Sequence, residues 1–224
     1  MNGFDLEEYM HQLTAGLQRL FGRELLYVGL QGSWRRGEAT KDSDIDVVVV
    51  LEQLDLERLE RYRTLLDELG NREQSCGFLC GKAELAGWNR LEICLLLHET
   101  KDYYGTLAGL VPSYTREDVR DYLKLGVGNL YHGLCHGYLH DHSGTFPQEL
   151  RQLYRSVFYL LQGLCWLRDG EYPLTYRETA QRLSGLDREV LELSAQMRDS
   201  AFEYEFEQAY RLLFLWCSHL LQTL

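Results

Sequence analysis

The stretch LQGSWRRGEATKDSDIDVVVVL, residues 30–51, decides the fold of the N-terminal half of the chain. It predicts the end of one strand, a tight turn at Gly32-Ser33, a polar excursion, and a second strand that is almost entirely apolar. Asp44 and Asp46 open the second strand and project side by side, because strand residues two apart share a face. Paired carboxylates repel each other unless a cation lies between them, and hard oxygen ligands suit Mg²⁺.

The charge of the chain limits the class of substrate. Its 34 acidic residues outnumber 23 basic ones, which gives a net charge of −11. Proteins that hold DNA or RNA by its phosphates normally carry a basic patch, so a long nucleic-acid substrate is disfavoured. An acidic surface suits a small or cationic acceptor better. The 224 residues, 45% of them hydrophobic, are enough for one large domain or two small ones.

The cysteines and the N-terminus predict a cytoplasmic protein. The cysteines are scattered, and several fall inside apolar runs, so we expect reduced and mostly buried thiols. The N-terminus is acidic and polar, unlike a signal peptide, and no apolar run is long enough to span a bilayer. We therefore expect no membrane partner. The six positions are Cys76, Cys80, Cys94, Cys135, Cys165 and Cys217.

Hydrophobic periodicity predicts alternating helices and strands before residue 100. Apolar residues at helical spacing predict a helix over 5–21 and another over 54–69. Residues 25–30 and 45–51 predict strands, and the second reads as buried on both faces because its apolar run is continuous. Residues 71–88 fit a short strand with a turn or a one-turn helix, and both alternatives stay open.

Residues 90–97, RLEICLLL, predict a further buried strand. Glu92 is its anomaly, because a carboxylate in a buried strand needs a partner or a metal. A Glu92 that faces solvent from an edge strand is the alternative. We favour a functional role for this carboxylate.

The second half of the chain predicts helices only. Strand signals stop after Lys101, and residues 102–115 read as a linker. Thr175 with Glu178, and Ser200 with Glu203, have the form of capping boxes. Short connections between antiparallel helices make a bundle. The fold class is therefore α+β, with one domain over 1–110 and a helical bundle over 111–224. The expected helices are 116–141, 149–168, 176–197 with a break near Gly185, and 200–223.

Gly32-Ser33, ten intervening residues, Asp44-Ile45-Asp46 and four valines resemble the signature of the nucleotidyltransferase superfamily that includes DNA polymerase beta. The resemblance implies that the Gly-Ser turn binds a nucleoside triphosphate and that the two aspartates hold one or two Mg²⁺. It also implies a third carboxylate from a later strand, and Glu92 fits that position as metal ligand, as base, or as both.

The polar spacer supplies candidate phosphate contacts. Arg35, Arg36 and Lys41 are the basic residues of this spacer. Solvated loop charges are the alternative for each of them. Of the three, we place Arg36 and Lys41 with Gly32 and Ser33 in the predicted nucleotide site.

The order of the two halves widens the resemblance. A compact nucleotidyltransferase domain followed by a helical bundle is similar to the bacterial antibiotic-modifying adenylyltransferases, such as the streptomycin and spectinomycin enzymes. The stretch YRSVFYLLQGLCWLRDGEYPLTYRETAQRL, residues 154–183, loosely resembles their C-terminal helices. The similarity implies ATP as co-substrate, a bundle that shapes the acceptor pocket, and a small-molecule acceptor.

Three functions remain open at this point. The first is transfer of AMP from ATP to a hydroxyl of a small molecule. Aminoglycoside-like antibiotics belong to this class of acceptor. The second is a protein-modifying, antitoxin-like adenylyltransferase, which the fused helical half disfavours because such proteins tend to be minimal domains. The third is a non-catalytic nucleotide-binding protein, which the three acids disfavour.

A histidine stripe on the first bundle helix belongs to none of these functions. His132, His136 and His140 are spaced four apart and so share one helical face. HxxxH can bind zinc on a helix. A metalloprotease would also need Glu at position 133, where Gly133 stands, and we expect a packed or pocket-facing stripe.

Overall fold

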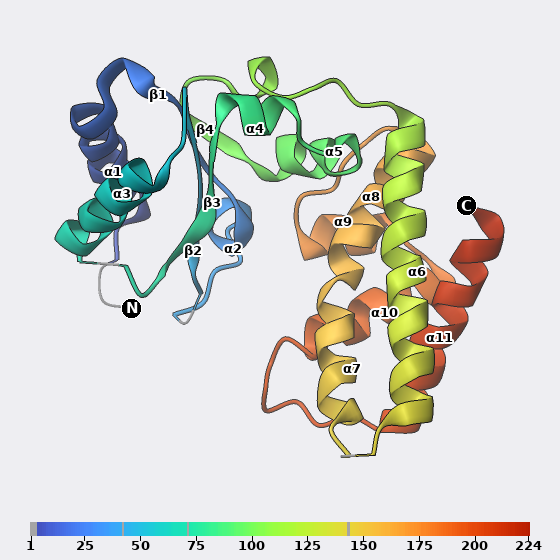
Figure 1. The fold of residues 1–224 in the computed structure, drawn as a ribbon. Helices are drawn as coiled ribbons and strands as arrows, with labels where there is room; N and C mark the ends of the chain where they lie inside the picture. The colour runs from blue at the N-terminus through green and yellow to red at the C-terminus, as the bar shows by residue number, and fades with distance from the viewer. Residues whose placement is uncertain (1–3, 42, 71, 143) are drawn as a thin grey trace. The chain divides into compact units, whose positions relative to one another are not determined.

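The computed structural model describes residues 4–41, 43–70, 72–142 and 144–224. The chain divides into two compact units, Met1–Ser113 and Tyr114–Leu224. The first unit holds a small sheet with flanking helices, and the second is helical (Figure 1). This arrangement confirms the predicted α+β fold class.

The sheet of the first unit has four strands in the order β3-β2-β1-β4. Strand β1 pairs antiparallel with both β2 and β4, whereas β2 and β3 are parallel. The parallel pair needs a crossover, which helix α3 (Leu56–Leu69) supplies. The strands are β1 Leu25–Leu30, β2 Ile45–Leu51, β3 Ser75–Gly81 and β4 Lys101–Tyr104.

Alternate residues of β2 build two different cores. We call the face covered by α1 (Leu6–Phe21) and α3 (Leu56–Leu69) the first face, and the opposite one the second face (Figure 1). The first face carries the larger core, which includes Ile45, Val47, Val49 and Leu51. Val48 and Val50 belong to the second face, which is packed by the segments that follow β3. Burial on both faces confirms the prediction from the continuous valine run.

Local signals explain why the helices of the first face begin and end where they do. The Asp5 carboxylate accepts a hydrogen bond from the Glu8 backbone N–H at 3.1 Å, and Asp55 caps α3 in the same way from Arg58 at 2.8 Å. Gly70 ends α3 at φ 77°, a conformation that favours glycine. The two helices predicted before residue 70, and the strands over 25–30 and 45–51, are confirmed.

The strand predicted over 90–97 is wrong. These residues form helix α5 (Arg90–Glu99), which begins where the Asn89 side chain accepts a hydrogen bond from the Leu91 backbone N–H. A short apolar run fits a buried helix as well as a buried strand, so periodicity alone does not separate them. The end of strand signals after Lys101 is also wrong, because β4 follows α5 at once. Residues 71–88 contain both β3 and the short helix α4 (Lys82–Ala86).

The second unit contains the predicted helices with two corrections. The expected helix over 149–168 is two helices, α7 and α8, and the capping box at Ser200 is wrong because α11 begins only after Glu205. The Thr175–Glu178 capping box is confirmed. The helices are α6 Arg116–His140, α7 Phe146–Arg155, α8 Val157–Asp169, α9 Tyr176–Arg182, α10 Gly185–Gln196 and α11 Phe206–Thr223.

Close packing and exposure divide helix α6 into two sides. A Cβ at Gly137 would lie 2.1 Å from the Phe146 ring, so glycine is needed where α6 meets α7. The histidine stripe lies on the exposed side, where His136 and His140 have ring centroids 5.0 Å apart. The expectation of a packed stripe is therefore wrong. Across the described ranges, no helix is long and apolar enough to cross a membrane.

Candidate active site

The Gly-Ser turn and the Asp46 carboxylate lie in contact. Strand β1 ends at Leu30, Gln31 has an extended backbone, and the short helix α2 (Gly32–Arg36) follows. The Gln31 backbone N–H donates to the Asp46 carbonyl at 2.7 Å, which fixes the turn against β2. A Cβ at Gly32 would lie 1.8 Å from Asp46 Oδ2, and Gly32 has φ 71°. Position 32 therefore admits only glycine while the carboxylate is in place.

A polar row crosses the second face of the sheet at this level. Asp46 pairs with Cys76 in the parallel register, and the backbone bond to Gln31 extends the antiparallel register by one residue. Gln31 in turn donates from Nε2 to Thr100 Oγ1 at 2.8 Å. Directly paired residues leave a sheet on the same side. Thr100, Gln31, Asp46 and Cys76 thus form one row, next to the apolar residues Val48 and Val50.

The two aspartates differ in environment. Asp44 is exposed, whereas Asp46 is half-buried. Partial burial raises the pKa of Asp46, the hydrogen bond from the Cys76 thiol and the charge of Arg36 lower it, and the neighbouring Asp44 raises it. A carboxylate whose charged form is disfavoured by burial and by a like charge gains from a bound cation. Asp44 lies just before β2, so the pairing of the two carboxylates around an ion stays a prediction.

The side chains of Ser33 and Lys41 have no partner among the described residues. In the described part of the chain, the Ser33 hydroxyl makes no hydrogen bond and Lys41 makes no ion pair. Arg35 is half-buried, and its Nε is buried without a hydrogen-bond partner among the described residues. An unpaired guanidinium N–H in the interior is available to an oxygen acceptor from a ligand.

Arg36 is committed to two acids. Its Nη1 lies 2.8 Å from Glu99 Oε2 and its Nε lies 3.2 Å from Glu38 Oε2. The side chains of Arg36 and Glu99 are only 4% and 5% exposed. A buried ion pair of this kind holds its elements in register. Arg36 thus ties α2 to the end of α5, and its predicted contact with phosphate competes with this pair.

Glu92 does not lie on a strand beside the aspartates. It lies in the first turn of α5, exposed, and its carboxylate accepts a hydrogen bond from Trp88 Nε1 at 2.7 Å. Trp88 packs edge-on against Phe78 of β3, with ring centroids 4.8 Å apart. The structural reason for making Glu92 the third carboxylate, a neighbouring strand, is therefore lost.

Sequence reasoning missed two residues of this region as participants. The cysteines are predicted to be mostly buried, but Cys76 is exposed and pairs with Asp46 in the parallel register of β2 and β3. Glu99, which the sequence analysis does not single out, is the buried partner of Arg36. Neither has a local signal, because each depends on a pairing between segments distant in sequence.

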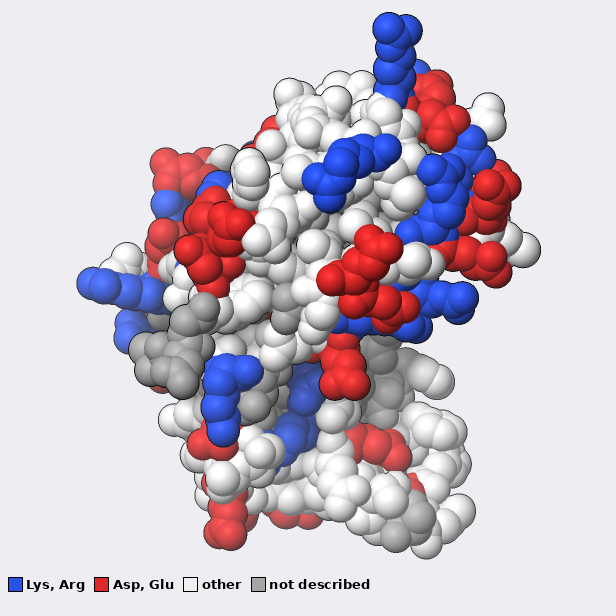
Figure 2. Space-filling model, turned by 90° about the vertical axis from the view of Figure 1, so that its left-hand side faces the viewer, with Lys and Arg blue, Asp and Glu red and all other residues white. Residues whose placement is uncertain are grey.

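On the face drawn in Figure 2, the described charged side chains form no continuous basic track. On the face drawn in Figure 2, basic and acidic side chains are interspersed among the described residues. Several of them pair, as Arg58 does with Glu24 at 2.7 Å. The described histidine, cysteine, aspartate and glutamate side chains form no preassembled group of three around a metal.

Comparison with known proteins agrees with this geometry. Residues 12–75 match the family model described as a nucleotidyltransferase domain, a segment that includes α1, the Gly-Ser turn and the aspartate pair. None of the curated proteins has a matching sequence.

Two solved structures resemble the chain to different extents. Spectinomycin adenyltransferase AAD(9) from Enterococcus faecialis, solved with ATP and spectinomycin, aligns with a TM-score of 0.57 at 13% identity, over 97% of this chain and 100% of that one. A toxin-antitoxin structure with AMP-PNP aligns with a TM-score of 0.33 at 22% identity, over 45% of this chain and 76% of that one.

At this identity, the first likeness shows a shared fold, from the sheet through the helical unit. The match over residues 12–75 contains the residues that bring the glycine-serine turn against the Asp46 carboxylate. Residues 12–75 are therefore similar to a nucleotidyltransferase domain, and the chain shares its fold with AAD(9).

Proposed function

We propose that the protein transfers AMP from ATP to a hydroxyl of a small-molecule acceptor, in a Mg²⁺-dependent reaction. The contact between Gly32 and the Asp46 carboxylate is the observation that carries the proposal. It puts a turn suited to phosphate beside carboxylates suited to the cation that accompanies a nucleoside triphosphate.

The donor set fits Mg²⁺. Asp44 and Asp46 offer hard carboxylate oxygens at the start of β2, and the charge of Asp44 disfavours the ionised form of Asp46. Mg²⁺ is commonly held by one or two carboxylates with substrate phosphates and water completing its shell, so a preassembled third protein ligand is not required. When bound, the ion stabilises charge on the phosphates and on the departing pyrophosphate.

The turn would hold the triphosphate. The Ser33 hydroxyl is uncommitted in the described structure, and successive backbone N–H groups of such a turn form an anion-binding nest. Lys41 contributes a mobile positive charge. Arg35, with its unpartnered Nε, is a better phosphate contact than Arg36, which is held by Glu38 and Glu99.

The reaction is a displacement at the α-phosphorus. The acceptor hydroxyl oxygen forms a bond to this phosphorus, the bond from phosphorus to the bridging oxygen of the β-phosphate breaks, and pyrophosphate leaves. The hydroxyl proton passes to solvent or to a base. The residues of the turn and β2 contribute by positioning the triphosphate and by stabilising its charge.

The second unit would provide contacts to the acceptor. The AAD(9) structure contains spectinomycin, and the shared fold extends through the helical unit. We therefore propose a polyhydroxylated small molecule of the aminoglycoside or aminocyclitol type as acceptor. The cytoplasm, where ATP and Mg²⁺ are abundant, is the proposed location.

Mass spectrometry of reaction products tests the proposal. The full chain is incubated with ATP, Mg²⁺ and separate acceptors, which include spectinomycin, streptomycin and a protein extract. We expect one small-molecule acceptor to gain the mass of one AMP, with one pyrophosphate released per transfer, and no gain when Mg²⁺ is chelated.

Each of the other results points to a different function. AMP found on a protein and on none of the small molecules would favour the antitoxin-like activity. Nucleotide binding in a thermal-shift measurement, with no transfer to any acceptor, would favour a non-catalytic nucleotide-binding protein. Either result overturns the proposed acceptor class.

A further inference from the structure

Helix α2 carries Ser33 but is too short to hold itself in place. It spans only Gly32–Arg36, whereas an isolated helix shorter than about 12–15 residues is marginal in water. The side chain of its N-cap residue, Gln31, makes no capping hydrogen bond to the helix. The position of the Gly-Ser turn therefore depends on contacts that other segments make with the two ends of α2.

Two consecutive residues at the end of α5, Glu99 and Thr100, contact both ends of α2. At the N-terminal end, Gln31 Nε2 donates a hydrogen bond to Thr100 Oγ1 at 2.8 Å. At the C-terminal end, Arg36 Nη1 lies 2.8 Å from Glu99 Oε2. Glu99 and Thr100 are only 4% and 8% exposed, so both contacts lie where polar interactions are stronger than in water. We call Glu99 and Thr100 the clamp.

The clamp is itself attached to the sheet. Thr100 is the C-cap of α5 and directly precedes β4, which pairs with β1 through Lys101 and Leu30. The Thr100 hydroxyl donates its hydrogen to the Leu96 carbonyl, which leaves its lone pairs for the Gln31 amide. The orientation of the hydroxyl is thus fixed by α5, and the clamp gives α2 a point of attachment that does not depend on α2.

We propose that Glu99 and Thr100 are positioning residues of the nucleotide site, which set the affinity for ATP by holding α2 at both ends. The inference rests on the proposed function, because that function makes the Gly-Ser turn hold the triphosphate. The backbone bond from Gln31 to the Asp46 carbonyl fixes the turn against β2, and the clamp fixes the same turn from the side of β4. Neither clamp residue needs to touch the nucleotide.

Calorimetric titration of the full chain with ATP and Mg²⁺ tests the N-terminal end. Thr100→Val keeps the shape of the side chain but removes the acceptor for Gln31, so the Kd for ATP should rise about three- to tenfold, the equivalent of one hydrogen bond. Thr100→Ser restores the hydroxyl and should restore most of the affinity. Gln31→Met and the double variant should bind ATP as weakly as Thr100→Val, because all three lack the same bond. Gln31→Met alone carries the test if Thr100→Val does not fold.

Thr179→Val is the matched control for Thr100→Val. Thr179 is also buried, and its hydroxyl donates to the carbonyl of Thr175, four residues earlier, as the Thr100 hydroxyl does to Leu96. Thr179→Val should leave the Kd for ATP unchanged, and an equal loss of affinity in this control would overturn the clamp.

Steady-state kinetics separate positioning from a purely structural role. Lower stability alone reduces the fraction of folded enzyme, which lowers the apparent kcat and leaves KM for ATP unchanged. Thr100→Val should instead raise KM for ATP at unchanged kcat, because the turn holds the triphosphate in the ground state and in the transition state alike. A lower kcat at unchanged KM would overturn the positioning role of Thr100.

Glu99→Gln tests the C-terminal end, and the sign of its effect is informative. The substitution weakens the hold on Arg36, so ATP should bind less tightly if Glu99 positions α2. If Glu99 instead competes with phosphate for Arg36, the substitution frees the guanidinium for the nucleotide and ATP binds more tightly. Tighter or unchanged binding would therefore overturn the role of Glu99.

The wild type separates failure of this inference from failure of the proposed function. Wild-type binding of ATP that stays unchanged in folded Thr100→Val and Glu99→Gln would overturn the clamp and leave the nucleotide site in place. A wild-type chain that binds no ATP in the presence of Mg²⁺, and transfers no AMP, would overturn the proposed function and the clamp with it.

Discussion

The two faces of the sheet use the same strand for opposite purposes. On the first face, alternate residues of β2 pack with α1 and α3 into the larger core of the unit. On the second face, Val48 and Val50 support a smaller core, and the next position along the strand is Asp46. The comparison teaches that the first face supplies most of the stabilising apolar packing. The second face carries a half-buried charge that lowers the stability of the folded state.

The charge of Asp46 lowers the stability of the folded chain. Burial and the adjacent Asp44 both disfavour the ionised form of this carboxylate. A site that binds a cation and a triphosphate needs that charge, so function and stability make opposite demands at this position. Substitutions on the two faces should therefore separate activity from stability.

Asp46→Asn should have the largest effect on activity. The amide keeps the shape of the side chain but removes a metal ligand, and loss of several kcal/mol of charge stabilisation corresponds to a roughly 10²- to 10⁴-fold lower rate. The melting temperature should stay equal or rise, because a partly buried charge is removed. Initial rates of AMP transfer and thermal unfolding measure the two effects.

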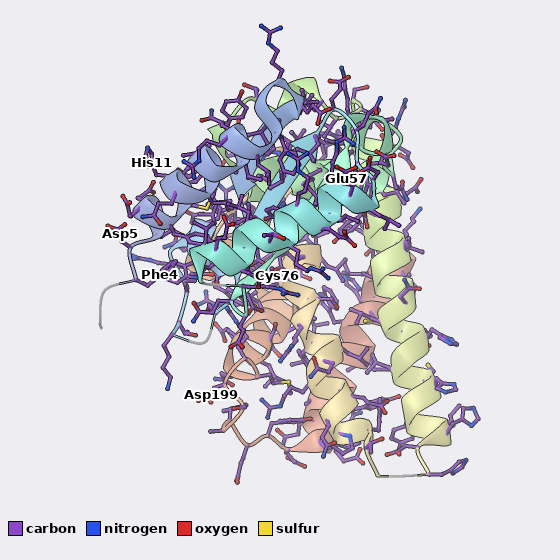
Figure 3. The ribbon with its side chains drawn as sticks, turned by 60° about the vertical axis from the view of Figure 1, so that its left-hand side comes forward. Phe4, Asp5, His11, Glu57, Cys76 and Asp199 are labelled. Atoms are coloured by element: carbon purple, nitrogen blue, oxygen red, sulfur yellow. The ribbon has the colours of Figure 1, made fainter. Side chains whose placement is uncertain are left out.

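Glu57→Gln is the matched control for that substitution. Glu57 lies at the start of α3, away from Cys76 in Figure 3, and its loss should leave the transfer rate unchanged. Transfer at the wild-type rate by Asp46→Asn would remove this residue from the active site. Lower stability of that variant would show that the second face also holds the fold.

Arg36→Met should have the next largest effect, which is a loss of unfolding free energy. It leaves Glu99 buried without its cation, and breaking one partner of a buried pair costs about 3–5 kcal/mol of unfolding free energy. Replacing Glu99 by Met as well should recover much of the loss. Chemical unfolding measures both variants, and the surface substitution Arg58→Met, which breaks more exposed pairs, should cost only about 0–1 kcal/mol.

The same substitution decides the role of Arg36. If Arg36→Met unfolds like the wild type but raises KM for ATP more than tenfold at unchanged kcat, Arg36 contacts phosphate, as the sequence predicts. Loss of stability with recovery in the double variant would instead make it a residue that positions α2.

The segment around residues 30–51 could be predicted from sequence because its signals are local. A glycine that tolerates positive φ, a run of valines and two alternating aspartates specify turn, strand and shared face without reference to the rest of the chain. Helix α1 and helix α3 were predictable for the same reason, since their caps and leucine stripes lie within the helices.

The structure of residues 72–104 could not be predicted from sequence because it depends on pairing between distant segments. Strand β3 is rich in glycine and cysteine, which have little preference for strands, and it forms because β2 supplies a parallel partner. The apolar run of α5 fits a buried strand as well as a buried helix, and only Asn89 at its start marks a helix cap. Contacts such as Asp46 with Cys76 are consequences of register, which no local pattern contains.

Leu13→Ala tests the first face. Leu13 is 0% exposed in the larger core, and truncating such a leucine costs about 2–5 kcal/mol of unfolding free energy through lost burial and the cavity left behind. The transfer rate well below the melting temperature should stay unchanged. Leu56→Ala, at a leucine that is 78% exposed, should change stability by no more than about 0.5 kcal/mol. A lower rate in folded Leu13→Ala would show that the two faces are not independent.

The smallest expected effect is at His98, which lies on α5, a helix that packs on the second face. Partial burial lowers the pKa of His98 below its ordinary value of 6.5, so the folded state resists protonation more than the unfolded state does. Its contribution to stability is present above the unfolded-state pKa and is lost as the pH falls through 6.5 toward the folded-state pKa. Melting temperatures measured between about pH 7 and pH 5 should therefore fall less steeply in His98→Gln than in the wild type. His11→Gln, at an exposed histidine of α1, should keep the wild-type slope, and equal slopes in all three proteins would show that His98 titrates as it does in water.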